Sequence, residues 1–198
     1  MAKSSKQWMR RHVTDPYVRQ AKAQGYRSRA AFKLIEIHER ERLFRPGMTV
    51  IDLGAAPGGW SQVAVEKVKP GGRVVAVDLL PIAPICGVEI FRGDFRAQPG
   101  LEEQRADVIL SDLSPNLSGI GNIDQARALE LTEAAIDFCR KVLKPGGVFV
   151  VKIFHGEAFD ELTARLKSVF EQVKIVKPSA SRGESRETYA LARNLRAR

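Results

Sequence analysis

Apolar residues follow two patterns along this chain, short runs and helical repeats. Short apolar or alternating runs at 48–53, 73–80, 88–91, 106–111, 148–154, 173–176 and 187–192 predict β-strands. Apolar residues that recur every three or four positions predict helices over about 17–24, 60–68, 124–143 and 157–169. Because strands and helices alternate from residue 48 onward, we expect an α/β fold with a parallel sheet whose two faces are covered.

The first 45 residues are organised differently from the rest. Short helices at 4–11 and 17–24 are separated by the Asp15-Pro16 break, and a longer helix lies within 25–44, with Ser28 as its N-cap. We therefore expect a basic N-terminal helical extension over 1–45 and a main domain over 46–198, which together form a single compact domain.

The composition is that of an ordinary globular protein. The chain has 198 residues, 44% of them hydrophobic and 28% charged, which is enough for one well-cored domain. No apolar run approaches membrane-spanning length and the N-terminus lacks a signal peptide's apolar core, so we expect a cytoplasmic monomer that binds no membrane. Cys86 and Cys139 are far apart and unpatterned, which predicts buried free thiols and no metal site.

Positive charge is concentrated at the two ends of the chain. Residues 1–45 contain 12 Lys and Arg against 4 Asp and Glu, and residues 177–198 contain 6 against 2. The middle, 46–176, contains 14 against 17. A basic rim on a neutral core suits a polyanion, because each neutralised phosphate releases condensed counterions, so the charge distribution favours a nucleic-acid partner.

A glycine-rich turn follows the first strand of the main domain. Gly54, Gly58 and Gly59 let the backbone turn tightly and come close to a bound molecule, and a helix begins at about residue 60. The dinucleotide fingerprint GxGxxG is absent. The turn alone therefore leaves nucleotide, flavin and S-adenosylmethionine (SAM) sites open.

Polar residues at the ends of later strands narrow this choice. Asp78 follows Gly58 by 20 residues, a position from which a carboxylate accepts hydrogen bonds from the ribose hydroxyls of NAD or SAM. Asp94 follows the next strand, where an acid could accept a hydrogen bond from an adenine amino group, although an acid at such a place is, taken alone, more often a turn residue. Asp112 follows the fourth strand, and Lys152 interrupts an apolar strand, where a buried lysine is costly unless it is paired or functional.

Six segments carry a set of motifs in order: SRAAFKL at 28–34, DLGAAPGGWSQ at 52–62, GDFR at 93–96, SDLSPNLSG at 111–119, VVKIFHGE at 150–157 and SRETY at 185–189. In these motifs the chain resembles the RrmJ/FtsJ family of SAM-dependent ribosomal RNA 2′-O-ribose methyltransferases. The resemblance implies a catalytic tetrad of Lys33, Asp112, Lys152 and Glu187. It places the SAM site at Gly58, Trp60, Asp78, Asp94 and Asp112, to which the turn adds Gly54 and Gly59.

The resemblance also implies a fold, a substrate and a mechanism. The fold is a Rossmann-like, seven-stranded, mostly parallel sheet with helices on both faces and an antiparallel last strand. The substrate is a uridine of large-subunit ribosomal RNA, in the assembled subunit. Lys152 takes the proton of the ribose hydroxyl, Asp112 orients Lys152 and the cofactor methyl, Lys33 assists, and Glu187 completes the charge network.

Three other readings remain open. An NAD-linked oxidoreductase shares Asp78 but needs GxGxxG and a hydride-handling acid. A non-catalytic RNA-binding protein explains the charged ends but leaves Lys152 unexplained. An mRNA cap methyltransferase uses the same tetrad, although no added cap-binding module is evident. A comparison of SAM binding with NAD binding by the purified protein separates the oxidoreductase from the other readings. Activity on RNA separates the non-catalytic RNA-binding protein from the methyltransferases.

Overall fold

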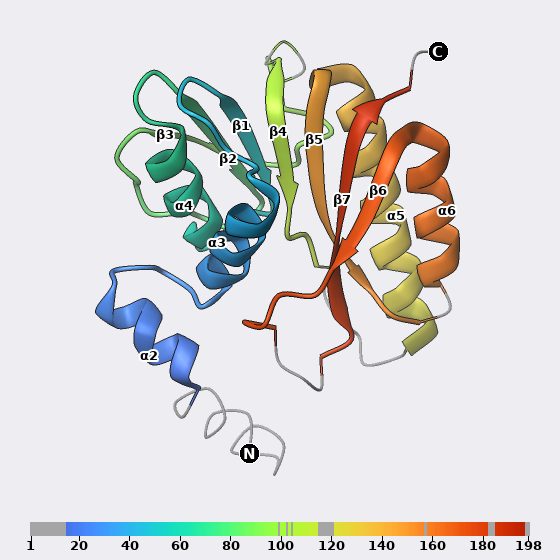
Figure 1. Cartoon of the computed structure of the whole chain (residues 1–198), viewed down its shortest axis with the longest axis horizontal. Helices are drawn as coiled ribbons and strands as arrows, with labels where there is room; N and C mark the ends of the chain where they lie inside the picture. The colour runs from blue at the N-terminus through green and yellow to red at the C-terminus, as the bar shows by residue number, and fades with distance from the viewer. Residues whose placement is uncertain are drawn as a thin grey trace.

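A seven-stranded sheet forms the centre of the molecule (Figure 1). This computed structural model describes residues 15–98, 100–101, 103, 105–114, 121–156, 158–181 and 185–196, so the helix expected at 4–11 lies outside the described residues. The strands are β1 Thr49–Leu53, β2 Arg73–Asp78, β3 Val88–Arg92, β4 Ala106–Ser111, β5 Leu143–Phe154, β6 Phe170–Val176 and β7 Glu187–Leu195. The helices are α2 Pro16–Ala23, α3 Ala30–Glu41, α4 Gly59–Val68, α5 Gly121–Val142 and α6 Ala158–Val169.

The strand order confirms the expected fold. It runs β3-β2-β1-β4-β5-β7-β6, and the pairs from β3 to β5 are parallel. The last strand, β7, lies between β5 and β6 and is antiparallel to both. The carboxyl ends of β1, β2, β4 and β5 therefore meet the beginning of β7 at one edge of the sheet, which is where α/β folds bind ligands.

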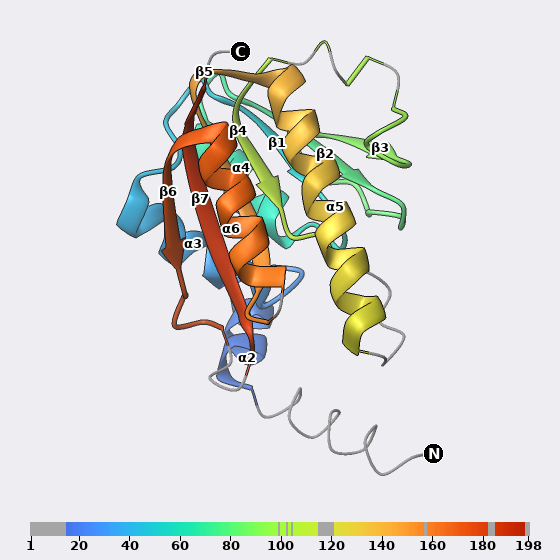
Figure 2. The same cartoon turned by 90° about the vertical axis from the view of Figure 1, so that its right-hand side faces the viewer.

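Helices cover both faces of the sheet, α3 and α4 on one side and α5 and α6 on the other (Figures 1 and 2). Side chains alternate between two apolar clusters, as the pleat of a strand requires. In β5, Val148 and Val150 belong to the cluster on the α3 side, and Phe149 and Val151 belong to the cluster on the α5 side. Since Lys152 comes two residues after Val150, it lies on the α3 side.

Helix α3 is part of the main core although it precedes the sheet in sequence. Its buried residues Leu34 and Ile37 belong to the same apolar cluster as Val63 of α4 and Val74 of β2. The division of the chain at residue 45 stays a prediction. Among the described residues, no helix combines the length and apolar character needed to cross a membrane.

Three local expectations are wrong. Cys86 is exposed, because it lies in the connection between β2 and β3, whereas Cys139 is buried as expected. Ser28 is not the N-cap of α3, because the helix begins at Ala30 with Arg29 at the N-cap and without a side-chain capping bond. The hydroxyl of Ser28 instead faces Gly59, so closely that a Cβ there would collide with it. Strand β5 begins at Leu143, which pairs with Ala106 before the register shifts, so residues 144–147 belong to the strand.

Candidate active site

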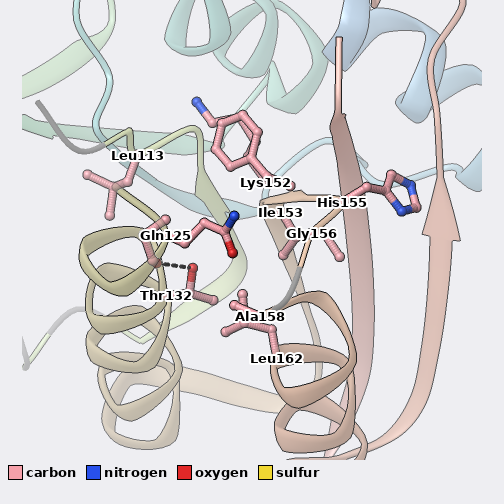
Figure 3. A pocket seen from close by; sticks show the side chains of 11 residues that line it. Leu113, Gln125, Thr132, Lys152, Ile153, His155, Gly156, Ala158 and Leu162 are labelled. Atoms are coloured by element: carbon pink, nitrogen blue, oxygen red, sulfur yellow. Dashed lines mark hydrogen bonds between the residues drawn. The ribbon is translucent and has the colours of Figure 1, made fainter. Parts of the chain in front are cut away.

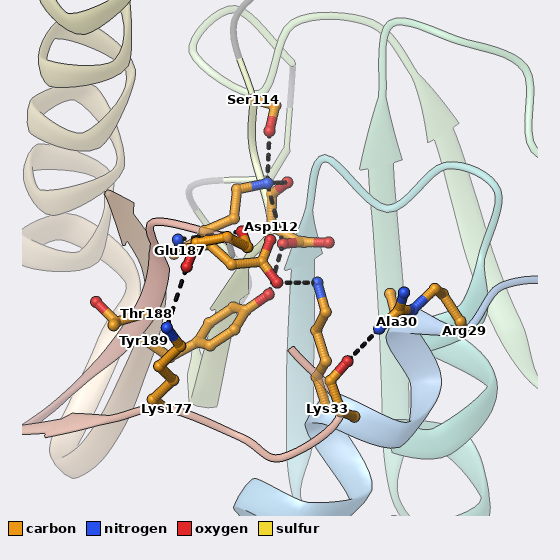
Figure 4. Close-up of polar contacts among 12 residues, drawn as sticks. Arg29, Ala30, Lys33, Asp112, Ser114, Lys177, Glu187, Thr188 and Tyr189 are labelled. Atoms are coloured by element: carbon orange, nitrogen blue, oxygen red, sulfur yellow. Dashed lines mark hydrogen bonds and ion pairs between the residues drawn. The ribbon is translucent and has the colours of Figure 1, made fainter. Parts of the chain in front are cut away.

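Four charged residues converge at the carboxyl edge of the sheet, on the α3 side (Figure 4). Period-2 alternation puts them there: Lys152 and Glu187 share a face with the core residues Val150 and Tyr189, and Asp112 follows buried Leu110 by two residues. Lys33 comes from α3, which covers this face. The structure thus brings together Lys33, Asp112, Lys152 and Glu187, the four residues that the sequence singled out.

Lys152 is held by the end of β4. Its Nζ lies 3.1 Å from Oδ1 of Asp112. It also donates hydrogen bonds to the carbonyl oxygen of Asp112 at 2.8 Å and to Oγ of Ser114 at 2.5 Å. The Lys152 side chain is only 7% exposed, against 25% for Asp112. The buried lysine is therefore paired, and its amine is fixed at the carboxyl edge of the sheet. The carboxylate of Asp112, which is more exposed to solvent, lies beside it.

Lys33 and Glu187 form a second pair. Nζ of Lys33 lies 2.5 Å from Oε1 of Glu187, and both side chains are largely buried, at 11% and 15% exposed. Burial alone raises the pKa of Glu187, but the positive charge of Lys33 and its hydrogen bond, with a smaller effect of the charge of Lys152, hold that pKa below its ordinary value. Glu187 is thus a carboxylate at neutral pH, and it fixes the amine of Lys33 near the second lysine.

Tyr189 connects the two pairs, and the sequence analysis treated it only as a strand residue. It is completely buried, and its hydroxyl donates to Oδ1 of Asp112 at 3.2 Å. Its ring centroid lies 5.5 Å from that of Trp60, and Nζ of Lys33 lies 5.9 Å from the ring. Burial and the nearby carboxylates of Asp112 and Glu187 raise the pKa of Tyr189 well above its usual value, so the hydroxyl stays a donor. The sequence did contain a signal for Tyr189: it follows Glu187 by two residues in a strand, so the two side chains lie on the same face of the sheet.

The glycine-rich turn lies beside these pairs and is tightly packed. Gly54 and Gly58 have φ of +73° and +109°, which favour glycine. A Cβ at Gly54 would lie 2.8 Å from a methyl carbon of Leu113, and one at Gly58 would lie 2.6 Å from Cδ1 of Ile85. At both glycines the backbone therefore comes close to neighbouring side chains of the protein, whereas the sequence had suggested a close approach to a bound molecule. The turn also borders α3, since the indole N–H of Trp60 donates to the carbonyl of Ala30 at 2.8 Å.

Asp78 is fixed beside the turn. Its Oδ2 accepts a hydrogen bond from the backbone N–H of Ala56, and its Oδ1 accepts one from that of Leu80, both at 2.8 Å. An ionised carboxylate has about four acceptor sites, so two remain for other donors. Partly exposed, oriented and with free acceptor capacity, Asp78 fits the two ribose hydroxyls of an adenosyl group.

Asp94 lies just beyond β3 and has a partner that the sequence analysis did not foresee. The guanidinium of Arg96 binds its carboxylate, with Nη2 at 2.5 Å from Oδ2, and the backbone N–H of Arg96 donates to Oδ1 at 2.9 Å. The hydrogen bond from Arg96 holds the pKa of Asp94 below its ordinary value. Asp94 is a fixed carboxylate, and an adenine amino group would share it with Arg96.

Asp52, at the end of β1, is a buried carboxyl group that the sequence analysis did not single out. It is completely buried; Oδ2 accepts a 2.6 Å hydrogen bond from Ser61, and Oδ1 has no partner among the described residues. Burial raises its pKa from 3.8 to about 7, the Ser61 hydroxyl opposes this shift, and the charges of Asp112 and Asp78 add to it. An unpaired oxygen beside the turn is consistent with a site that binds a polar ligand.

A pocket opens behind Lys152, between α5, α6 and the end of β5 (Figure 3). Its walls are mostly apolar, from Leu113, Ala128, Ile153 and Leu162, and the side chain of Gln125 projects into it (Figure 3). No group of three or more His, Cys, Asp or Glu side chains in the described ranges is placed to hold a metal ion. The donor set at this edge, carboxylates and amines, suits an organic ligand with hydroxyl and amino groups.

Comparison with known proteins connects this geometry to a family. A model described as FtsJ-like methyltransferase matches residues 26–195. A protein of Legionella pneumophila named ribosomal RNA large subunit methyltransferase E is 54% identical over 198 residues, covering 96% of each chain. Among solved structures, one named as a ribosomal RNA methyltransferase from Plasmodium falciparum superposes with a TM-score of 0.78 and 29% identity, covering 87% of this chain and all of that one. Aeropyrum pernix fibrillarin with bound SAM shares the fold, with a TM-score of 0.61 and 17% identity over 84% of this chain and 75% of that chain.

Proposed function

This chain belongs to the FtsJ-like methyltransferase family, and we propose that it transfers the methyl group of SAM to the 2′-hydroxyl of a uridine in large-subunit ribosomal RNA, within the assembled subunit. The name of the Legionella relative supports ribosomal RNA of the large subunit as the substrate class. The choice of a ribose hydroxyl rests on the site. Because the Legionella relative is a bacterial protein, and bacterial ribosomal subunits assemble in the cytoplasm, we propose that this protein acts there.

The observation that carries the proposal is the buried amine of Lys152, held at the strand edge by Asp112. An alcohol is a poor nucleophile at neutral pH, so transfer to a ribose hydroxyl needs a base or a positive charge beside the oxygen. Lys152 offers both: a neutral amine accepts the proton, and the carboxylate of Asp112 then stabilises the ammonium that forms. An amine that is already protonated would instead stabilise the negative charge that develops on the oxygen.

The chain's own residues fit SAM, which supplies an electrophilic methyl group when bound. Asp78 would accept hydrogen bonds from the ribose hydroxyls, and Asp94 would accept one from the adenine amino group. The turn from Gly54 to Gly59 and the beginning of α4 at Trp60 would border the methionine part. Asp112 lies between this region and Lys152, so it would orient both the methyl group and the base.

The basic ends of the chain would bind the RNA backbone. Arg19 and Lys22 are exposed on α2, and Lys33 lies at the site itself. With Lys33 fixed by Glu187, a phosphate or ribose oxygen of the substrate could be positioned next to Lys152. Charge would attract the RNA, and the four paired residues would select the geometry of transfer.

Mass mapping of ribose methylation in ribosomal RNA, from cells with and without this protein, tests the proposal. We expect one 2′-O-methyluridine of the large-subunit RNA to disappear without the protein and to return with the wild-type gene but not with Lys152→Ala. Identical ribose methylation in both cell types, or loss of a methyl group from a base, would contradict it.

A further inference from the structure

The guanidinium of Arg27 joins two segments that lie on either side of Asp78. It donates hydrogen bonds to the carbonyl oxygens of Pro57 at 3.2 Å, Ala83 at 2.6 Å and Pro84 at 2.7 Å. Pro57 belongs to the glycine-rich turn, and Ala83 and Pro84 belong to the loop between β2 and β3, residues 79–87. One side chain therefore connects three parts of the chain that are distant in sequence.

The loop depends on an outside donor. Its sequence, LLPIAPICG, contains no Asn, Ser, Lys or Arg that could satisfy a carbonyl, and its two prolines lack an N–H. Its first residues, Leu79 and Leu80, are 67% and 63% exposed, so packing holds this end weakly. Asp78 and Arg92 bind the backbone of these first two residues. The side-chain donor for the middle of the loop, at Ala83 and Pro84, is Arg27.

The turn and the loop are fastened at two points. Asp78 binds both of them, because its two carboxylate oxygens accept the N–H groups of Ala56 and Leu80. Arg27 also binds both, at Pro57 in the turn and at Ala83 and Pro84 in the loop. The interaction is tight, since a Cβ at Gly58 would lie 2.6 Å from Cδ1 of Ile85 and 3.1 Å from Nη1 of Arg27.

Arg27 is itself anchored. Its backbone N–H donates to Oε1 of Gln62 on α4 at 2.9 Å, and Nε2 of Gln62 donates to the carbonyl of Gly25 at 3.0 Å. The side chain thus extends from a fixed point on α4 rather than from a free linker. Arginine suits the role, because its planar fork presents several N–H groups to several acceptors, whereas lysine has a compact ammonium.

We propose that Arg27 is a positioning residue for the cofactor, which holds the turn and the loop so that Asp78 and the turn are already arranged for the adenosyl group. The inference rests on the proposed function, since it takes SAM as the ligand. Ordering the loop before binding removes an entropic cost from binding, so loss of Arg27 lowers SAM affinity while the groups that transfer the methyl stay in place.

Calorimetric titration with SAM tests this, using wild type, Arg27→Ala, Arg27→Lys and the control Arg73→Ala. Arg73 is also a partly exposed arginine with a bidentate partner, Glu89, but it lies at the other end of β2. We expect about tenfold weaker SAM binding in Arg27→Ala, a smaller loss in Arg27→Lys, and binding within about twofold of wild type in the control. Amide hydrogen exchange of residues 79–87 in the protein without SAM should be faster in Arg27→Ala only.

A kinetic readout separates positioning from catalysis. At saturating SAM, methyl transfer by Arg27→Lys should stay within a few fold of wild type, while its KM for SAM rises. SAM affinity equal to wild type in both Arg27 variants would overturn the inference, and if Arg27→Ala fails to fold, Arg27→Lys decides alone. A wild-type protein that does not bind SAM would instead overturn the proposed function.

Discussion

Nζ of Lys33 on α3 and Oε1 of Glu187 on β7 lie 2.5 Å apart, so the four charged residues of the site form two ion pairs. Tyr189 lies between the two pairs, because its hydroxyl donates to Asp112 of the second pair and its ring faces Lys33 of the first. Each lysine thus has its own carboxylate. This arrangement assigns Glu187 a definite partner, which the sequence could not do.

The first prediction concerns coupling within the Lys33–Glu187 pair. Lys33→Met and Glu187→Gln should each reduce kcat/KM, but the double variant should be little worse than either, because each single change already leaves the other group without its partner. We expect a coupling energy of about 1 kcal/mol or more in this double-mutant cycle. Lys33→Met combined with Asp94→Ala serves as the control and should be nearly additive. Additivity in the Lys33–Glu187 cycle would contradict the pairing.

The second prediction concerns the cofactor carboxylates. Asp78→Ala and Asp94→Ala should each weaken SAM binding by about 1–3 kcal/mol, the scale for leaving a polar partner unsatisfied. Calorimetry measures this loss. Because Asp94 is bound by Arg96, Arg96→Ala is the control that shows how much of the Asp94 effect comes from the released arginine. Unchanged affinity in both aspartate variants would contradict their assignment to the cofactor site.

Much of this site was accessible from the sequence, for a physical reason. Strand periodicity and the apolar runs place Lys152 and Asp112 at one edge of the sheet, because parallel strands end together. The motifs that resemble a methyltransferase family supply Lys33 and Glu187. The antiparallel position of β7 puts Glu187 opposite Phe154 in the register, beside Lys152.

Other features depend on side-chain reach, which no spacing rule encodes. The binding of Arg96 to Asp94 and the three carbonyl bonds of Arg27 arise because a long side chain selects among several acceptors after folding. Ser28 resembles an N-cap in sequence, but α3 begins two residues later and the Ser28 hydroxyl lies against Gly59. The unpaired oxygen of Asp52 becomes visible only when burial is known.

The third prediction follows from the raised pKa of Asp52, about 7 in the folded protein against 3.8 for the ordinary group. Between these values the folded protein holds a proton that the unfolded chain has lost. This group's contribution to stability is therefore fully present below about pH 4 and falls by about 1.4 kcal/mol per pH unit until about pH 7.

Asp52→Asn keeps the size of the side chain and an acceptor for Ser61, but it cannot ionise. The free energy of unfolding of this variant, relative to wild type, should therefore rise from about pH 4 to about pH 7 and then level off. Urea unfolding at a series of pH values measures the difference. Parallel stability curves for the two proteins would mean that Asp52 titrates at its ordinary pKa.

The fourth prediction concerns RNA binding by the basic ends, which include Arg182, outside the described residues, and Arg186. Log affinity should fall linearly with log salt, with a slope of about −0.7 to −0.9 per phosphate contact. Replacing the exposed Arg19 and Lys22 of α2 by Gln should reduce that slope. The same change at Lys67 and Lys69, also exposed but at the far end of α4, should not. An RNA affinity that does not change with salt, or a slope that is the same in wild type and the α2 variants, would leave the basic ends without a role in binding.

The central claim, that the Lys152 amine acts on a ribose hydroxyl, is tested most directly by single-turnover transfer of labelled methyl from SAM. The substrate is large ribosomal subunits from cells that lack this protein. Arginine keeps the charge of Lys152 but holds its proton at working pH and is broader, so Lys152→Arg should slow transfer by about 100-fold or more while SAM still binds. The wild-type label should be found on the 2′-oxygen of a uridine. Transfer by Lys152→Arg within a few fold of wild type, or a label on a base, would contradict the account.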